Sequence, residues 1–483
     1  MVFQNDILAG SSASGTSTAV HTIDQSIRFN SSDSTYMQRT HGAGGNTDKW
    51  TVSFWIKKGD HSLSAPQFVF GSGANTSNTF DLYFESSPVD TLAIQDYASA
   101  YNVQLKTTQL FRDPSAWYHI VYVYDSGNAV STERARLYVN GQRVTDFGTE
   151  TYPSQNQDSI VGTNVNIGFG RYISNGSNYF NGYLAEMHYV NGSALDPSSF
   201  GEYNSSNIWI PKEYSGSYGT GGFYIKGEDS SDLGNDSSGN GNDLTTSGLA
   251  SHDQVADSPT NNFAVANPLD SSYYMGSETF SEGNLQMTLG SSVGGLATMG
   301  ITSGKWYAEF EVHSDASGTT YFIIGIYGDQ PTSTQHFVGY TSNSYGYYAL
   351  NGNSYTNFTS SSYGNSYTVG DVVGVAVDLD NNKLYFSKNG TFQNSGDPTS
   401  GASGTGAISI NPVSSTGLGA YFIASSSASS TPSGHTINYN FGQDGTFAGN
   451  VTAGGNSDGN GIGNFKYSVP SGYLALCTKN LGS

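Results

Sequence analysis

Residues 370–390 read GDVVGVAVDLDNNKLYFSKNG, and this stretch decides the architecture of the second half of the chain. Apolar side chains alternate from Val373 to Leu379 and again at Leu384 and Phe386, which is the period of a β-strand. Asp-Asn-Asn between the two runs suits a tight turn, because these side chains bond the local backbone and tolerate positive φ. Asn-Gly at the end supplies a second turn. The pattern predicts a β-hairpin that further antiparallel strands must bury.

The hairpin and its neighbours resemble a known domain type. The Gly-Asp entry, the turn and the Lys-Asn-Gly exit are similar to the central signature of the SPRY (B30.2-like) β-sandwich. Residues 304–311 (GKWYAEFE), 324–326 (IGI) and 437–442 (INYNFG) resemble other strands of that domain, in the same order. The resemblance implies a SPRY-like sandwich with a C-terminal segment over residues 276–483.

The composition of the whole chain indicates an all-β protein of about two domains. Of 483 residues only 12% are charged, whereas Gly (61), Tyr (34) and Phe (25) are abundant. The sequence has no heptads and no apolar run able to span a bilayer. The net charge of −21 would repel phosphate backbones and anionic membranes, so neither nucleic acid nor membrane insertion is expected. The single cysteine, Cys477, excludes an intrachain disulfide and is expected to be a buried apolar residue.

Residues 1–22 are expected to form an N-terminal arm. Its start, MVFQNDILAGSSASG, lacks the positive charge and the apolar run of a secretory signal. This favours a cytoplasmic product, or a virion part that is assembled in the host cytoplasm and exposed on the particle surface. Phe3 and Leu8 lie in a short apolar patch and are the candidate virion anchor, with a frayed chain end as the alternative.

Short strands are predicted at regular spacing in the first half. Alternating apolar residues occupy residues 50–56, 117–124, 137–139, 165–169 and 180–190. Asn140-Gly141 is a hairpin turn signal. Such spacing predicts a sandwich or jelly roll. The one helical signal is Asp196-Pro197 followed by residues 198–203, with a capping residue and proline at the first helical position.

The segments WTVSFWIKKG, WYHIVYVYD, RLYVNGQRV and FNGYLAEMHYVNGSALDPSSFGEY resemble, in sequence order, a laminin-G or concanavalin A-like lectin domain over residues 23–205. Residues 206–275 are crowded with Pro, Gly, Asn and Asp and are expected to form an ordered connector, with a strand near residues 222–226. The predicted fold class is therefore all-β, with two antiparallel β-sandwich domains in series, the first jelly-roll or concanavalin A-like and the second SPRY-like.

This serial arrangement resembles virion proteins of tailed phages of the marine type. The resemblance implies a virion surface protein, and a tail-associated adhesin that binds a host-surface glycan or another envelope component is the leading hypothesis. Its expected partners are other virion proteins, the host glycan and further copies of the chain. A capsid fibre or head decoration protein is the alternative, because the sequence lacks the heptads and repeats of a long shaft. A glycan depolymerase is the third hypothesis.

Catalytic chemistry has one candidate. Glycosidases of concanavalin A-like folds place two carboxylates on one strand, and Glu309-Phe310-Glu311 puts two on one strand face. The third acidic residue of that pattern is absent, because His313 and Ser314 follow. The nine histidines show no metal-ligand spacing, and no nucleophile elbow or phosphate loop occurs. We therefore expect no enzymatic activity and no catalytic residues.

Calcium is the candidate metal, although no cofactor is expected to be required. Asp236, Asn240 and Asp243, with Asp232 and Asn242 nearby, crowd one Gly-rich loop and offer the oxygen ligands that calcium takes. The alternative is that these residues were selected for turn geometry alone.

Aromatic residues in a polar stretch are the candidate ligand-binding set. Rigid rings among Ser, Asn, Gly and Thr are typical of adaptable binding loops, and the CH faces of sugars stack on such rings. The alternative is that the rings belong to strands that cover the sandwich or a subunit contact. The candidates are Tyr345, Tyr347, Tyr348, Tyr355, Phe358 and Tyr363, with Tyr367 close by.

Overall fold

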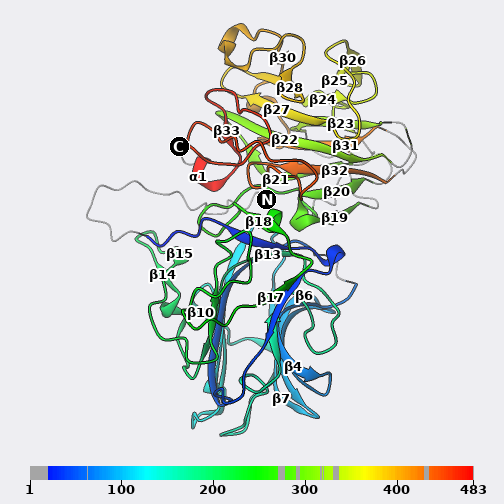
Figure 1. Cartoon of the computed structure of the whole chain (residues 1–483). Helices are drawn as coiled ribbons and strands as arrows, with labels where there is room; N and C mark the ends of the chain where they lie inside the picture. The colour runs from blue at the N-terminus through cyan, green and yellow to red at the C-terminus, as the bar shows by residue number, and fades with distance from the viewer. Residues whose placement is uncertain are drawn as a thin grey trace. The chain divides into compact units, whose positions relative to one another are not determined.

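The computed structural model describes residues 20–61, 64–269, 278–289, 294–315, 318, 320–329, 337–428 and 434–481 (Figure 1). Phe3 and Leu8, the candidate anchor, lie outside the described residues. The chain divides into two compact units, with the boundary between Asn262 and Phe263. We call residues 20–262 the N-terminal unit and the described residues from 263 onward the C-terminal unit.

The N-terminal unit contains two large antiparallel sheets. The first has the order β10-β9-β8-β3-β13-β1-β18, and β16 also pairs with β13. Its strands are β1 (Ser26–Phe29), β3 (Lys49–Lys58), β8 (Trp117–Asp125), β9 (Ala135–Val139), β10 (Gln142–Arg143), β13 (Gly182–Asn191), β16 (Phe223–Ile225) and β18 (Gln254–Val255).

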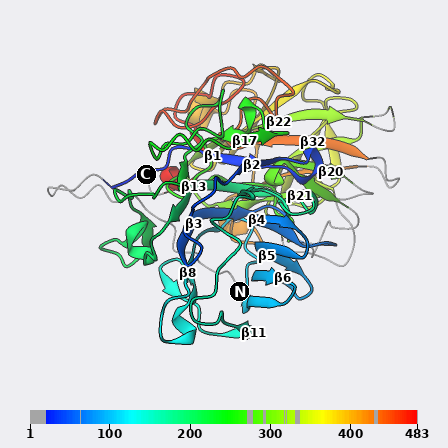
Figure 2. The same cartoon turned by 60° about the horizontal axis from the view of Figure 1, so that its bottom comes forward.

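The second sheet has the order β11-β7-β6-β5-β4-β12-β2-β17, and Figure 2 shows its strands β4, β5 and β6 side by side. Its strands are β2 (Tyr36–Thr40), β4 (Gln67–Asn75), β5 (Asn78–Ser86), β6 (Val89–Ala98), β7 (Tyr101–Leu110), β11 (Phe147–Thr151), β12 (Asn166–Phe169) and β17 (Thr245–Ser247). A separate pair joins β14 (Gly201–Tyr203) to β15 (Trp209–Pro211).

The core of the N-terminal unit forms where the inner faces of its two sheets meet. Trp50 of β3 has no exposed surface; its ring lies 4.9 Å from that of Phe80 on β5 and stacks on Tyr124 of β8 at 5.7 Å. These contacts combine both sheets because alternate side chains of each strand point inward. The strands predicted from residues 50–56, 117–124, 165–169 and 180–190 are confirmed as β3, β8, β12 and β13.

The C-terminal unit is a second sandwich of two sheets. One has the order β19-β20-β32-β22-β27-β28-β29, with β30 beside β28 and β33 parallel to β22; the other has the order β21-β31-β23-β24-β25-β26. The strands are β19 (Thr279–Ser281), β20 (Gln286–Leu289), β21 (Gly294–Ile301), β22 (Lys305–Ser314), β23 (Phe322–Tyr327), β24 (Ser344–Tyr348), β25 (Ser354–Thr356), β26 (Thr359–Ser361), β27 (Val372–Asp378), β28 (Lys383–Lys388), β29 (Thr391–Phe392), β30 (Ile408–Ser409), β31 (Tyr421–Ser427), β32 (His435–Asn440) and β33 (Leu474–Ala475).

The hairpin predicted from residues 370–390 is confirmed. Strands β27 and β28 pair with Asp378 opposite Lys383, and the inward residues Val373, Val375 and Phe386 have no exposed surface. The turn at Asn389-Gly390 has the two positive φ values, 49° and 78°, that Asn-Gly turns favour. The all-β fold class and the two sandwiches in series are likewise confirmed.

Helical structure is short throughout the described part of the chain. One α-helix, α1 (Thr478–Leu481), is described, and the 3-10 turns are Ser31–Asp33, Ser131–Glu133, Pro197–Ser199, Ser251–Asp253, Glu282–Asn284, Pro398–Ser403 and Val413–Ser415. The helix predicted over residues 198–203 is wrong: only Pro197–Ser199 turns, and Gly201–Tyr203 is strand β14. The side chain of Asp196 makes no capping hydrogen bond, and pairing with β15 satisfies the backbone instead. None of the described helices has the length and apolar character that a membrane span requires.

The expected connector shows a different organisation. Residues 206–262 fall in the N-terminal unit, and strands β16, β17 and β18 add to its two sheets. Strand β16 confirms the strand expected near residues 222–226. The loops between these strands are rich in turn residues, and only β16 is an apolar run, which is why the sequence resembles a linker although its short strands pair with β13, β2 and β1.

Candidate functional site

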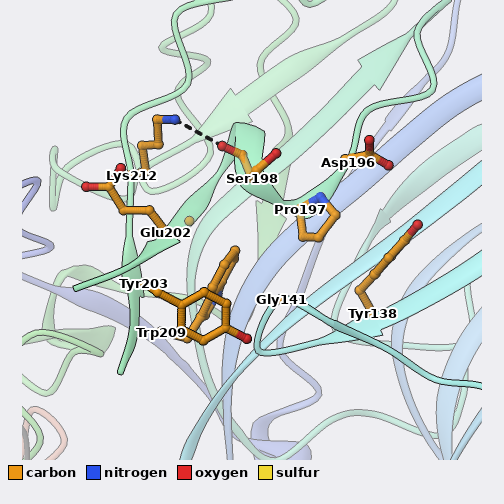
Figure 3. A pocket seen from close by; sticks show the side chains of 10 residues that line it. Tyr138, Gly141, Asp196, Pro197, Ser198, Glu202, Tyr203, Trp209 and Lys212 are labelled. Carbon is orange, nitrogen blue, oxygen red and sulfur yellow. Dashed lines mark hydrogen bonds between the residues drawn. The ribbon is translucent and has the colours of Figure 1, made fainter. Parts of the chain in front are cut away.

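A shallow groove of about 370 Å³ opens on the surface of the N-terminal unit (Figure 3). It lies where the β9–β10 hairpin meets the β14–β15 pair and the turn at Pro197–Ser199. It combines aromatic rings with charged side chains. The lining residues are Tyr138, Gly141, Asp196, Pro197, Ser198, Gly201, Glu202, Tyr203, Trp209 and Lys212.

Trp209 is the central ring of the groove and is held at one edge. Its indole Nε1–H donates to Nδ1 of His119 at 3.0 Å, and the His119 ring is nearly parallel to it, at 5.9 Å and 25°. His119 is buried, and burial lowers its pKa to about 3, so the ring is neutral. Because Nδ1 accepts from Trp209, the ring proton is on Nε2, which donates to Ser53 Oγ at 2.8 Å. The indole orientation is therefore set before any ligand arrives.

Two glycines let the main chain approach the indole. A Cβ atom at Gly141 would lie 2.5 Å from the Trp209 ring, and one at Gly201 would lie 2.4 Å from it. Gly141 also has a φ of 76° beside Asn140 at 48°, which confirms the predicted hairpin turn. Any larger side chain at either position would displace Trp209.

The second ring of the groove is exposed. Tyr203 is 42% exposed and meets Trp209 edge to face, with 4.9 Å between ring centroids. Its hydroxyl donates to the carbonyl of Asn140 at 3.3 Å and accepts from the side-chain amide of Gln142. These bonds tie the ring to the β9–β10 turn, so Tyr203 is oriented as Trp209 is.

Three charged side chains, Asp196, Glu202 and Lys212, also line the groove. Tyr203 and Trp209 are paired across β14 and β15 and share one face of the pair, whereas Glu202 points to the other face, and Figure 3 shows its carboxylate turned away from the rings. All three charged side chains are exposed, and Lys212 Nζ donates to the Ser198 carbonyl at 3.1 Å. Aromatic rings together with charged side chains in one groove can hold a ligand that has both CH faces and hydroxyl groups.

The structure places most of the predicted ligand-binding aromatic set in the interior, which corrects that hypothesis. Tyr345, Tyr347, Tyr348 and Tyr363 are 0–8% exposed, and Tyr367 is 2% exposed. They are buried because their rings pack in hydrophobic clusters of the C-terminal unit: Tyr345, Tyr347, Tyr363 and Tyr367 in the main core, and Tyr348 in a smaller cluster with Ile323 and Tyr327. Only Tyr355, which is half-buried, and Phe358, which is 65% exposed, offer surface to a ligand.

The predicted calcium loop is held together by its own hydrogen bonds. The Asp236 carboxylate accepts four, from the amides of Tyr224, Ser238 and Asn242 and from the Ser238 hydroxyl, at 2.8–2.9 Å. Asp243 accepts from the Asp236 amide. The side-chain amide of Asn240 donates to two main-chain carbonyls. Turn geometry thus accounts for the three residues, and calcium binding at this loop stays a prediction.

Glu309 and Glu311, the candidate catalytic pair, are 0% and 4% exposed. The Glu309 carboxylate accepts from the amides of Lys466 and Tyr467 at 2.7 and 2.8 Å and from the Tyr307 hydroxyl at 3.1 Å. Glu311 accepts from the Asn438 amide at 2.7 Å. These bonds give both carboxylates a structural use, with Glu309 holding the C-terminal segment against β22.

The sequence did not single out the groove at Trp209. Trp209, Glu202 and Lys212 come from the end of the predicted lectin domain and the start of the predicted connector. Of the groove, the sequence pointed only to the Asn140-Gly141 turn and to Asp196-Pro197, which it predicted as the start of a helix. A tryptophan in a short apolar run between polar turns was the available signal, and it is equally typical of a core strand.

Two domain-family models match the chain. Residues 30–199 match the model of the concanavalin A-like lectin/glucanases superfamily, and residues 305–410 match the SPRY domain. The chain carries a concanavalin A-like domain followed by a SPRY domain. Both predicted domain resemblances are confirmed. Trp209 and Lys212 of the groove lie just beyond the residues matched to the concanavalin A-like domain.

Solved structures similar to parts of the chain include three of known source. The SPRY domain of human HERC1 is 22% identical, with a TM-score of 0.26, and the match covers 32% of this chain and 87% of that one. A putative carbohydrate binding protein from Bacteroides ovatus is 14% identical (TM-score 0.28; 47% and 58% covered). The CBM40 of Ruminococcus gnavus IT-sialidase, bound to α2,6 sialyllactose, is 14% identical (TM-score 0.25; 33% and 94% covered). A comparison with curated proteins gives no match.

Proposed function

We propose that this protein is a glycan-binding adhesin and that its concanavalin A-like domain holds a sugar in the groove at Trp209. The observation that carries the proposal is the pair of oriented rings, Trp209 and Tyr203, in a groove that Asp196 and Lys212 also line. The CH face of a sugar ring packs on an aromatic face, while carboxylates accept hydrogen bonds from its hydroxyl groups.

The fixed geometry of the rings favours binding. Trp209 is held by His119 and by close contact with Gly141, and Tyr203 is held by the β9–β10 turn. Ordering a free side chain on binding costs about 0.5–1.5 kcal/mol, and rings that are already ordered avoid that cost. Lys212 adds a positive charge on a strongly acidic chain, which would also accommodate an acidic substituent on the sugar.

Replacing Trp209 with alanine is expected to weaken glycan binding about 10- to 100-fold, because a buried aromatic contact contributes roughly 1–3 kcal/mol. Binding would be measured with the full chain on a glycan array that includes bacterial envelope polysaccharides. Tyr101→Ala is the matched control, because Tyr101 is an aromatic of similar exposure (46%) to Tyr203 and is not among the residues lining the groove. Equal array signals for wild type and Trp209→Ala would refute the groove as the binding site.

We further propose that the adhesin is a bacteriophage virion surface protein, associated with the tail and assembled with other virion proteins and further copies of itself. The support is the serial arrangement of a lectin-like domain, a turn-rich segment and a SPRY domain, which resembles tailed-phage virion proteins of the marine type. A capsid fibre or head decoration protein is the second candidate, because no shaft-forming repeat occurs in the sequence.

Gold-labelled antibody against the SPRY domain, applied to intact phage particles and viewed by electron microscopy, would test the virion proposal. Label at the tail is the expected result, since a host-binding protein must meet the cell first. Label spread over the head would replace the tail adhesin with the decoration protein. Particles without label would exclude both virion roles but would not bear on glycan binding at the groove.

We propose no glycan cleavage, since the candidate carboxylates Glu309 and Glu311 are buried in hydrogen-bonded positions.

A further inference from the structure

The β25–β26 hairpin of the SPRY domain ends in an unusual turn. Thr356 pairs with Thr359, so the turn consists of Asn357 and Phe358 alone. Both have positive φ, 48° and 56°. Two-residue hairpin turns with positive φ at both positions strongly prefer Asn-Gly, because a side chain at the second position meets the backbone.

The same chain uses glycine at this position in two other hairpins. The turns Asn140-Gly141 and Asn389-Gly390 have φ values of 48° and 76°, and of 49° and 78°. A bulky residue in the left-handed region is a genuine outlier and is retained where the side chain has another use. Phe358 therefore occupies a glycine position.

Burial in a core does not supply that use. Phe447 also has a positive φ, 52°, but it is 2% exposed, so burial of its ring offsets the strain. Phe358 is 65% exposed, which is the highest value among the large apolar side chains of the described residues. A side chain that is strained in the backbone and exposed to water points to a role in recognition.

Phe358 is the outermost ring of an aromatic cluster. Its ring centroid lies 5.0 Å from that of Tyr340 and 6.1 Å from that of Phe337, and Phe337 in turn lies 6.1 Å from Tyr355. The main chain holds the cluster together, because the Phe358 amide donates to the Gly339 carbonyl at 3.1 Å. A Cβ atom at Gly339 would lie 2.6 Å from Tyr355 Cβ, so only glycine allows this approach.

The stretch of chain that contains the cluster carries no charge. From Phe337 to Gly370 the sequence contains no Asp, Glu, Lys, Arg or His, although the chain has a net charge of −21. The polar groups of this stretch are the hydroxyls and amides of Ser, Thr, Tyr and Asn. An anionic ligand would lack a counter-charge from this stretch, whereas a neutral ligand with hydroxyl groups and CH faces matches both the rings and the amides.

We infer that the hairpin tip at Phe358 is a second binding site, and that it takes an uncharged saccharide. The site extends glycan recognition to the SPRY domain and is separate from the groove at Trp209, because its residues all belong to the C-terminal unit. Phe358 supplies the stacking face, and the side chains of the surrounding uncharged stretch supply hydrogen bonds.

The test compares Phe358→Gly with wild type by affinity electrophoresis of the full chain in native gels that contain mannan, β-glucan or galactan. At least one of these neutral polysaccharides is expected to retard the wild type, and Phe358→Gly is expected to lose most of that retardation. The same variant should raise the melting temperature of the SPRY domain by about 2–4 °C, because Asn-Gly fits the turn better. Loss of binding together with a gain in stability would exclude misfolding as the cause.

Matched variants make the result specific. Phe358→Tyr keeps the ring and should keep the retardation, and Val130→Gly removes an exposed apolar side chain (56% exposed) from the other unit and should change nothing. Trp209→Ala should leave retardation by the hairpin tip in place, which separates this site from the groove. Three outcomes would overturn the inference. The wild type is retarded by none of the neutral polysaccharides, the acidic polysaccharide alginate retards it as strongly as they do, or Phe358→Gly is retarded as much as the wild type. A concentration-dependent self-association that Phe358→Gly abolishes would assign the tip to a copy of the chain instead.

Discussion

Replacing Asp257 with alanine is expected to lower the free energy of unfolding of the N-terminal unit by about 3–5 kcal/mol, because it leaves a buried ammonium group without its carboxylate. Lys57 Nζ lies 2.7 Å from Asp257 Oδ2, and neither side chain has exposed surface. Trp117 Nε1–H also donates to Asp257, at 3.1 Å. The substitution thus removes the acceptor of the buried Lys57 ammonium and of the half-buried Trp117 indole, both on the first sheet.

Scanning calorimetry of the full chain would measure this effect as a fall of about 10 °C or more in the melting temperature of the N-terminal unit. Glu228→Ala is the control, since it removes a carboxylate that is 62% exposed and 3.3 Å from Lys226 Nζ. An exposed pair contributes about 0–1 kcal/mol, so this control should hardly change the transition. An Asp257→Ala transition within 2 °C of wild type would contradict the assignment of the buried pair.

Replacing Glu309 with alanine is expected to destabilise the SPRY domain by about 3 kcal/mol. The amides of Lys466 and Tyr467 lose their acceptor, and a buried donor left without a partner costs about 1–3 kcal/mol. The C-terminal segment that follows Phe465 should then detach from β22 more readily. Thermal unfolding and hydrogen exchange of residues 464–475 would measure the two effects.

The pH dependence sharpens the Glu309 test. Burial raises the pKa of Glu309 to about 7 from an ordinary value of 4.5. Between about pH 4.5 and 7 the folded domain therefore keeps this proton while the unfolded chain has lost it. The stabilisation that protonated Glu309 contributes to the fold is full below pH 4.5 and is lost as the pH rises through about 7. Glu309→Ala should cost more stability at pH 5 than at pH 8. Glu311→Gln alters a carboxylate that accepts from one side-chain amide, and it should cost less stability than Glu309→Ala at both pH values. A larger loss of stability in Glu311→Gln than in Glu309→Ala would show that Glu309 does not anchor the segment.

The strands could be predicted from the sequence because their patterns are local. Alternation at Val373, Val375 and Val377 and the Asn-Gly turns depend on neighbouring residues only, and both were confirmed. The pairing of β17 with β2 and of β18 with β1 depends on contacts between residues far apart in the chain, so the sequence pattern did not predict it.

The candidate sites were harder to predict for a different physical reason. Tyrosines favour strands whether they face a core or a ligand, so composition could not tell Tyr347, which is buried, from Phe358, which is exposed. The proposed binding role of Phe358 follows from its positive φ angle and its exposure, which the sequence alone does not give. Trp209 was missed because its partner His119 lies on β8, far away in the sequence.

The late strands of the N-terminal unit have a consequence for its synthesis. Strands β17 and β18 cover the outer edges of β2 and β1, which the ribosome makes well before them. At about 5–20 residues per second, these early edges wait on the order of ten seconds or longer for their partners. Unpaired strand edges are templates for aggregation. The nascent chain therefore passes through a period in which chaperone protection of β1 and β2 would decide the yield of folded protein.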